Sequence, residues 1–196
     1  MVSFLVLYGT GEGQTAKVAD RITEAFVERG HDATAVDVTE MPPDFDVETF
    51  DAACIGASIH MGKQQPAVRE FVSARRDALA ARPTAFFQLS MSSAVDDETR
   101  RAEAAGYVDA FLEETDWHPD RVGLFGGALR YSKYGFLKRL VMKRIAKDAT
   151  GDTDTSRDYE YTDWHEVESF ADDFAAFVEG RLGAEPPDAS DAGGAE

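Results

Sequence analysis

The sequence predicts a doubly wound α/β protein, in which helices cover both faces of one parallel sheet. Short β-rich runs alternate with longer helical patterns five times along the chain, which indicates parallel strands joined by right-handed crossovers. Hydrophobic residues make up 43% of the chain, too many for a disordered protein and enough for a sizeable core. The length of 196 residues fits one domain. We place that domain at 1–182, followed by an acidic, disordered tail at 183–196 that lacks apolar periodicity.

Each element follows from its own pattern. The first strand, 2–8, is a nearly continuous apolar run, as expected for a strand that is covered on both faces. The next helix, from 14 to about 29, repeats apolar residues at every fourth position from Val18 to Phe26, and Gly30 ends it. The same two patterns predict the remaining strands at 34–38, 52–57, 84–90 and 122–127, and the remaining helices at 66–79, 98–115 and 163–182.

The charge of the chain excludes one class of partner. With 37 acidic and 20 basic residues the net charge is -17, and such a surface repels nucleic acid. Arginines outnumber lysines by 14 to 6, and the acidic residues are spread over the predicted helices. Because molar salt screens charges within about 3 Å, we interpret this surface as an adaptation to a salty, halophilic cytosol. An ordinary acidic protein is the alternative.

Cysteines and histidines indicate neither a metal site nor hydrolase chemistry. The single cysteine, Cys54, lies in an apolar stretch and cannot form an internal disulfide or a thiolate cluster. Three histidines, His31, His118 and His165, flank helix ends or turns, where we expect them to be solvated. No Ser-His-Asp or metal-ligand pattern occurs, so we expect no metal. Without a basic leader or a run of about 18 apolar residues, the protein is expected to be cytoplasmic.

A glycine-rich turn follows the first strand and leads into the first helix. Three glycines let the backbone fold tightly with its N–H groups exposed, and the helix N-terminus adds unsatisfied donors and about half a positive charge. The turn is therefore predicted to cradle a phosphate through backbone N–H groups, two hydroxyls and one amide side chain. Its residues are Thr10, Gly11, Glu12, Gly13, Gln14 and Thr15.

Three kinds of anion site use such a turn. The ATP-binding loop requires a lysine, and none precedes Thr15. The dinucleotide fingerprint requires a glycine where Gln14 stands, although Asp37 could bind a ribose and keeps NAD open. The order of hydroxyls, glycine and threonine resembles the flavodoxin phosphate loop best, with Glu12 where a third hydroxyl is common. A carboxylate beside a phosphate is unfavourable, so we expect Glu12 to face solvent.

Two more small, polar turns fall at the same edge of the predicted sheet, after the third and fourth strands. An isoalloxazine ring requires apolar contact on one face, and N–H and hydroxyl groups around its edge. The candidate flavin-binding residues are Ser58, Ile59 and His60, with Met61 beside them, and Ser90, Met91 and Ser92. His60 is a candidate catalytic group, and a solvated surface imidazole is the alternative.

A basic segment interrupts the acidic chain. No acidic residue occurs between Asp120 and Asp148, and the cations in this window alternate with apolar side chains. This composition is typical of a helix that lies on anionic lipid or binds a carboxylated ligand, or else packs on its own domain. The cations of the predicted patch are Arg130, Lys133, Lys138, Arg139, Lys143, Arg144 and Lys147.

Several motifs together resemble the flavodoxin-like, quinone-dependent protoporphyrinogen oxidase family. They are found at 55–59 (IGASI), 117–121 (WHPDR), 127–131 (GALRY), 153–155 (TDT) and 161–164 (YTDW), along with the basic segment. The resemblance covers about residues 1–180. It implies a flavodoxin-like fold with a five-stranded parallel sheet in the order 2-1-3-4-5 and an insertion at about 130–158 before the last helix.

The same resemblance implies a function in haem biosynthesis. FMN, held chiefly by 10–15 and by the turn after the fourth strand, oxidises protoporphyrinogen IX and passes the electrons to menaquinone at the membrane. His60 and Met61 stand where the family has Arg and Tyr, which leaves the substrate open between a porphyrinogen and another small redox compound. A flavodoxin-like electron carrier, a quinone reductase with another substrate and a flavin-free interaction domain are the alternatives. A homo-oligomer is also left open.

Overall fold

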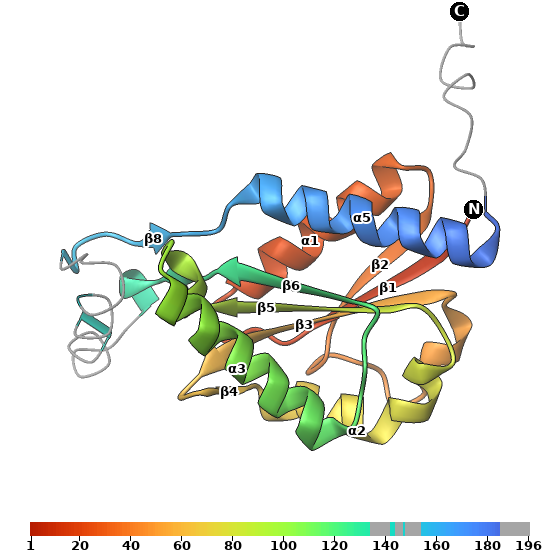
Figure 1. Ribbon diagram of the computed structural model, residues 1–196, viewed down its shortest axis with the longest axis horizontal. Coiled ribbons are helices and arrows are strands. Elements are labelled where there is room, and N and C mark those ends of the chain that lie inside the picture. Colours follow the sequence, from red (N-terminus) through yellow and green to blue (C-terminus); the bar gives the residue numbers. More distant parts are fainter. Residues whose placement is uncertain (134–141, 144–146, 148–153, 185–196) are drawn as a thin grey trace, which may run out of the picture.

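The protein is a three-layer sandwich of helices, parallel sheet and helices (Figure 1). A computed structural model describes residues 1–133, 142–143, 147 and 154–184. The doubly wound α/β class predicted from the sequence is confirmed. Most of the predicted insertion, and the predicted tail beyond 184, lie outside the described residues.

Five parallel strands form the main sheet. They are β1 (Ser3–Tyr8), β2 (Asp32–Asp37), β3 (Ala52–His60), β5 (Thr84–Ser90) and β6 (Arg121–Gly126). The order β2-β1-β3-β5-β6 confirms the predicted order of the five main strands. The chain leaves β1 first toward β2 and later returns to the other side of β1 with β3. Parallel sheets of this kind bind ligands beyond the carboxyl ends of the strands at such a reversal.

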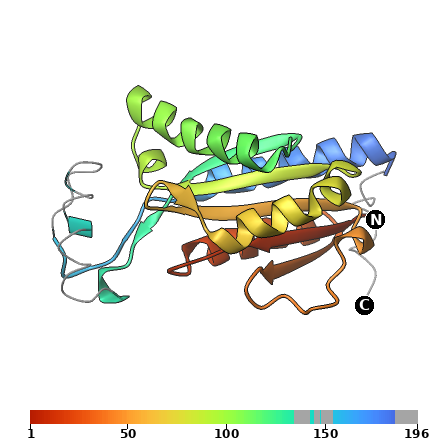
Figure 2. The ribbon, with the colours of Figure 1, turned by 90° about the horizontal axis from the view of Figure 1, so that it is seen from below.

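Helices cover the sheet on both faces (Figures 1 and 2). They are α1 (Gln14–Glu28), α2 (Pro66–Ala80), α3 (Glu98–Thr115) and α5 (Trp164–Leu182), with short 3-10 turns η1 (Val47–Thr49), η2 (Ser92–Ala94) and η3 (Tyr131–Lys133). Two helices begin at aspartates that accept backbone N–H groups of the first turn, Asp97 for α3 and Asp163 for α5. Gly183, with a φ of 64°, ends α5 in the left-handed conformation.

Each face of the sheet has its own apolar core. Under α1 and α5, Phe4 stacks on Phe26 with ring centroids 4.2 Å apart, and Phe174 packs edge-on against Phe4. Under α2 and α3, Phe86 packs against Phe111 and Trp117. Cys54 is buried within the sheet, where desolvation raises the pKa of its thiol. The predicted inert role of this cysteine therefore agrees with its surroundings.

The structure adds two short ribbons that the sequence patterns did not predict. Strand β3 runs three residues beyond its predicted end at 57 and turns back into β4 (Lys63–Gln64), an antiparallel hairpin. Further along, β7 (Ala128–Leu129) pairs antiparallel with β8 (Tyr159–Glu160). The second ribbon brings the two ends of the predicted insertion together at the carboxyl end of the sheet (Figure 1).

One expectation about the histidines is wrong. His31, predicted to be solvated, has a fully buried side chain whose Nε2 lies 2.8 Å from Oε1 of Glu179. Arg29 donates to the same carboxylate from Nε and Nη2, at 2.7 and 2.9 Å. Helix α5 covers the end of α1 at this point, so a position that looks like a helix end in the sequence is an interface between two helices.

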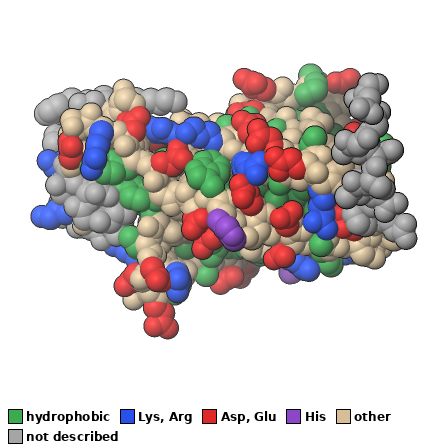
Figure 3. Space-filling model, turned by 90° about the horizontal axis from the view of Figure 1, so that it is seen from above, with side chains coloured by type: hydrophobic (Ala, Val, Ile, Leu, Met, Phe, Trp, Pro, Cys, Tyr) green, Lys and Arg blue, Asp and Glu red, His purple; other side chains and the backbone are tan. Residues whose placement is uncertain are grey.

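Acidic side chains crowd the outer face formed by α1 and α5, with basic side chains between them (Figure 3). Arg21 is paired there with three carboxylates, those of Glu24, Glu28 and Glu168. Isolated surface pairs of this kind contribute less than about 1 kcal/mol each, and salt weakens them further. Arginine side chains that pair with several carboxylates therefore neutralise part of the excess negative charge locally.

Candidate functional site

A cleft opens at the carboxyl ends of the strands, where the turns that follow β1, β3 and β5 lie side by side. The structure brings most of the predicted flavin-binding residues together in its wall. The cleft is lined by Thr10, Glu12, Gln14, Thr15, Ser58, Ile59, His60, Leu89, Ser90, Met91, Gly127, Ala128 and Met142. Of the predicted residues, Gly11, Gly13 and Ser92 are not among the lining, and the segment 127–128 is an addition.

The turn between β1 and α1 has the form of an anion cradle. Gly13 has a φ of 94°, a left-handed conformation that favours glycine, and its N–H donates to Oγ1 of Thr10 at 2.9 Å. Because that oxygen accepts the bond, the hydroxyl proton of Thr10 remains available to a ligand. Among the described residues, no acceptor binds the backbone N–H groups of Gln14, Thr15 and Ala16. These free donors and the helix dipole fit a phosphate group.

Two side chains of the cradle differ from expectation. Glu12, predicted to face solvent, is half-buried and lines the cleft. Gln14, predicted to offer its amide N–H to the phosphate, is buried and donates Nε2 to Oγ1 of Thr162 at 2.9 Å. Its Oε1 accepts from Nη2 of Arg130 at 2.7 Å. The Gln14 amide is therefore committed to protein partners, and the backbone and Thr10 remain to bind an anion.

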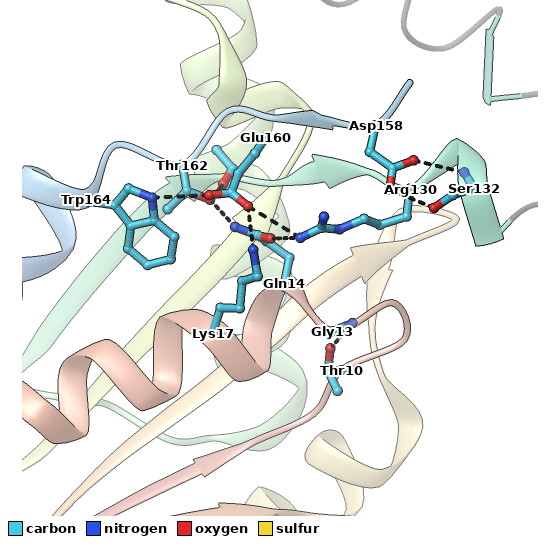
Figure 4. A network of polar contacts seen from close by, with 11 residues as sticks. Thr10, Gly13, Gln14, Lys17, Arg130, Ser132, Asp158, Glu160, Thr162 and Trp164 are labelled. Carbon is cyan, nitrogen blue, oxygen red and sulfur yellow. Dashed lines mark hydrogen bonds and ion pairs between the residues drawn. The ribbon is translucent and has the colours of Figure 1, made fainter. Parts of the chain in front are cut away.

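A polar network joins this cradle to the segments on both sides of the insertion (Figure 4). The hydroxyl of Thr162 donates a hydrogen bond to the carbonyl oxygen of Gly126, at 2.8 Å. Glu160 accepts from Lys17 at 2.9 Å, from Arg130 at 3.3 Å and from Trp164 at 3.2 Å. Desolvation raises the pKa of Glu160, but Lys17 and the other donors outweigh it and lower that pKa below its usual range. Glu160 is therefore a carboxylate at neutral pH.

The hairpin of β3 and β4 forms the next wall of the cleft. Gln65 fixes Ser58 from both sides, since its Oε1 accepts the Ser58 N–H at 3.0 Å and its Nε2 donates to the Ser58 hydroxyl. At the rim, the ring of His60 lies so close to Gly11 that a Cβ on Gly11 would meet Nε2 at 2.7 Å. Met61 does not face the cleft as expected, because it is fully exposed at the tip of the hairpin.

Helix α3 supports the turns that follow β3 and β5. The carboxylate of Glu103 accepts hydrogen bonds from the hydroxyls of Ser92 and Tyr107, both at 2.8 Å. Behind the hairpin, Gln64 donates to Gln88 at 2.7 Å, and Gln88 donates to the carbonyl of Ala104 on α3. Sequence reasoning did not find Glu103, Gln64 or Gln88, because the bond from Ser92 to Glu103 spans 11 positions and the bond from Gln64 to Gln88 spans 24.

Two of the described residues of the basic segment contribute to the cleft. Arg130 bonds to the cradle, and Met142 lines the cleft next to Met91 in a small apolar cluster with Leu129 and Tyr131. The remaining described cations of the predicted patch, Lys143 and Lys147, are exposed, whereas Lys138, Arg139, Arg144 and the side chain of Lys133 lie outside the described residues.

The described part of the chain contains neither a cluster of metal ligands nor a membrane-spanning helix. In residues 1–133, 142–143, 147 and 154–184, no three His, Cys, Asp or Glu side chains gather as they would around a metal ion. Within the same described part of the chain, no helix is both long and apolar enough to cross a membrane.

Comparison with known proteins shows the family. A family model of the flavodoxin domain matches residues 5–156. The chain is 35% identical over 172 residues to the protoporphyrinogen IX dehydrogenase (quinone) of Escherichia coli (strain K12), covering 87% of this chain and 93% of the relative. The protein of the same name from Leishmania major is 34% identical over 176 residues, or 88% of this chain and 74% of the relative.

A solved structure supports the fold. An archaeal flavodoxin superposes with a TM-score of 0.53 over 90% of this chain and 99% of its own, at 15% identity. At 15% identity this similarity is evidence for the fold alone. The evidence for the family comes from the two relatives above. The chain therefore belongs to the flavodoxin-domain proteins and, among them, to the protoporphyrinogen IX dehydrogenase (quinone) family.

Proposed function

We propose that the chain is an FMN-dependent oxidoreductase that oxidises protoporphyrinogen IX, or a closely similar porphyrinogen, and passes the electrons to a quinone such as menaquinone. The observation that carries this proposal is the 35% identity that extends over 93% of a relative named for that reaction. The cleft supports it independently, because its donors and apolar walls fit the two ends of a flavin mononucleotide.

In this proposal each part of the cleft binds one part of the cofactor. The backbone N–H groups of 14–16 and the hydroxyl of Thr10 hold the phosphate. Ile59, Met91 and Met142 provide apolar contact for the ring, while the hydroxyls of Ser58 and Ser90 lie in the same wall for its polar edge. Bound FMN supplies the capacity to accept two electrons and to release them one or two at a time.

The chain's own residues support the walls of the cleft. Helix α3 is bonded both to the hairpin and to the turn after β5, so we expect little reorganisation of the cleft when charge moves. His60 lies exposed at the rim beside Gly11 and stays our candidate for exchanging a proton with the substrate.

Thr10 provides the first test. We expect Thr10→Val to weaken FMN binding about tenfold, because it removes one donor to the phosphate and the acceptor of the Gly13 N–H. Thr10→Ser keeps the hydroxyl and is the matched control. Titration of flavin fluorescence measures both. Equal FMN affinity of the valine and serine variants would contradict the assignment of the cradle.

Turnover then tests the reaction. The FMN-loaded protein is expected to oxidise protoporphyrinogen IX with menaquinone as acceptor, at a rate well above that of free FMN. If it binds FMN and exchanges single electrons with a protein partner but shows no such turnover, it is an electron carrier. Purified protein that stays colourless when FMN is supplied would instead be a flavin-free interaction domain.

We also propose a peripheral place at the inner face of the cell membrane, where quinone is found. The exposed Lys143 and Lys147 support it, since neither lines the cleft, whereas Met142, which precedes them, does. Replacing both lysines by Glu is expected to abolish flotation with anionic vesicles and to leave FMN affinity unchanged. Unchanged flotation, or equal flotation with zwitterionic vesicles, would contradict this role.

A further inference from the structure

We propose that Arg130 is a positioning residue that sets the affinity of the cradle for the phosphate end of the flavin. It acts through Gln14 and through its own charge, without belonging to the backbone donors that touch the phosphate. This inference rests on the proposed function and deepens it, because it explains how a strongly acidic protein holds a nucleotide dianion.

The contacts of Gln14 place Arg130 at the right point of the cradle. Gln14 is the first residue of α1, and its backbone N–H is one of the free donors. Its buried side chain is held at both ends, by Arg130 at Oε1 and by Thr162 at Nε2 (Figure 4). A side chain held at both ends cannot fold over the helix N-terminus, so the first turn stays open to an anion.

Charge supplies the second argument. The chain carries a net charge of -17, so its overall field opposes the approach of a phosphate dianion. Glu12 and Glu160 add two carboxylates close to the cradle. Lys17 and Arg130 both contact Glu160, and their two positive charges balance these two carboxylates. Without Arg130, the single positive charge of Lys17 would remain against both carboxylates.

Burial favours Arg130 over Lys17 in this role. The side chain of Arg130 is 18% exposed, and that of Lys17 is 51% exposed. A cation that is shielded from water interacts more strongly with a nearby anion than a solvated one does. The motif at 127–131, which looks like part of a substrate or membrane patch in the sequence, therefore contributes its arginine to the cofactor end of the cleft.

Riboflavin separates this role from a merely structural one, because it has the flavin ring but lacks the phosphate. We expect Arg130→Met to raise the Kd for FMN about tenfold and the Kd for riboflavin less than about twofold. Arg130→Lys keeps the charge and is expected to retain most of the FMN affinity. Thr162→Val removes the other hydrogen bond of Gln14 without a change in charge, so it is expected to affect FMN less than Arg130→Met does.

The measurement is quenching of flavin fluorescence, at low and at molar salt, with the full chain. Arg76→Met makes the same change in charge on α2, at an exposed pair with Asp77 and Asp116, and is expected to leave both affinities unchanged. The gap in FMN affinity between wild type and Arg130→Met is expected to narrow at molar salt.

Two results would overturn the inference while the proposed function stands. One is a wild type that binds FMN and an Arg130→Met variant that binds it equally well. The other is a variant that loses FMN and riboflavin affinity by the same factor, which indicates a general structural role. A wild type that binds no FMN overturns the proposed function itself, so the two failures are distinguishable.

Discussion

Replacing Glu179 by Ala is expected to lower the free energy of unfolding by about 3 kcal/mol. The carboxylate joins Arg29 and His31 across the interface of α1 and α5, and the His31 side chain is fully buried. The His31 Nδ1 accepts the N–H of Val2 at 3.4 Å, so the neutral ring carries its proton on Nε2 and donates it to Glu179. Without Glu179 that donor is buried and unsatisfied, and Arg29 loses a bidentate partner.

The same variant is expected to change the pH dependence of stability. Hydrogen bonding from Arg29 lowers the pKa of Glu179, against desolvation and with the help of His31. A carboxyl whose pKa is lower in the folded than in the unfolded state stabilises the protein above the unfolded value of about 4.3. This contribution disappears as the pH falls through the folded pKa. The difference between wild type and variant should therefore be full at pH 7 and shrink on acidification.

Chemical denaturation at a series of pH values measures both effects. Glu24→Ala is the matched control, because Glu24 is a largely exposed carboxylate that pairs with Arg21 at the surface. Its effect is expected to stay below about 1 kcal/mol. A difference between wild type and Glu179→Ala that stays constant from neutral to strongly acidic pH would contradict the assigned role of the carboxylate.

Gly126→Ala is expected to destabilise the protein by about 2–3 kcal/mol and to weaken FMN binding at the same time. A Cβ on Gly126 would lie 2.2 Å from the carbonyl oxygen of Tyr161, a backbone atom that cannot rotate away. The two segments would have to separate, which strains the bond from the Tyr161 N–H to Gly127 and the bond from Thr162 to Gly126. Gly127 lines the cleft, so the displacement reaches the cofactor site.

Gly106→Ala is the matched control for this change. Gly106 lies within α3, and a Cβ there would meet no atom within 4 Å. Alanine in a helix is more favourable than glycine by about 0.5–1 kcal/mol, so this variant should be slightly more stable than wild type. Thermal unfolding and FMN titration compare the two variants. If Gly126→Ala matched wild type in both measurements, the close approach of 126 and 161 would not constrain the site.

The layers could be predicted because they depend on local patterns, whereas the strand order was implied by the resemblance to the flavodoxin-like family. Apolar residues every fourth position identify α1, and a continuous apolar run identifies β1. The turn of the hairpin after β3 consists of Met61, with a φ of 51°, and Gly62, with a φ of 79°. Gly62 fits a tight turn, but asparagine, aspartate or glycine is usual where Met61 stands, so the sequence pattern did not predict the hairpin. Polar residues at the end of β3 were therefore interpreted as a loop.

The position of the candidate site could be predicted from the sequence, but the hydrogen bonds between its residues could not. The glycine-rich turn and the small residues after β3 and β5 predict a phosphate and a flavin at one edge of the sheet. The amide of Gln14 was assigned to the phosphate because its partner Thr162 lies 148 positions away and leaves no signal in local spacing. His31 and Glu179 are also 148 positions apart, so burial of His31 was equally hidden.

These long separations order the events of folding. Bringing distant positions together costs more chain entropy than a local contact does, so the bonds from Gln14 to Arg130 and to Thr162 close only after the sheet has aligned its strands. We therefore expect the cradle to be completed in a late step, and a growing chain to hold the proposed nucleotide firmly only after residue 162 has left the ribosome. Capture of the proposed cofactor is then expected after synthesis of almost the whole domain.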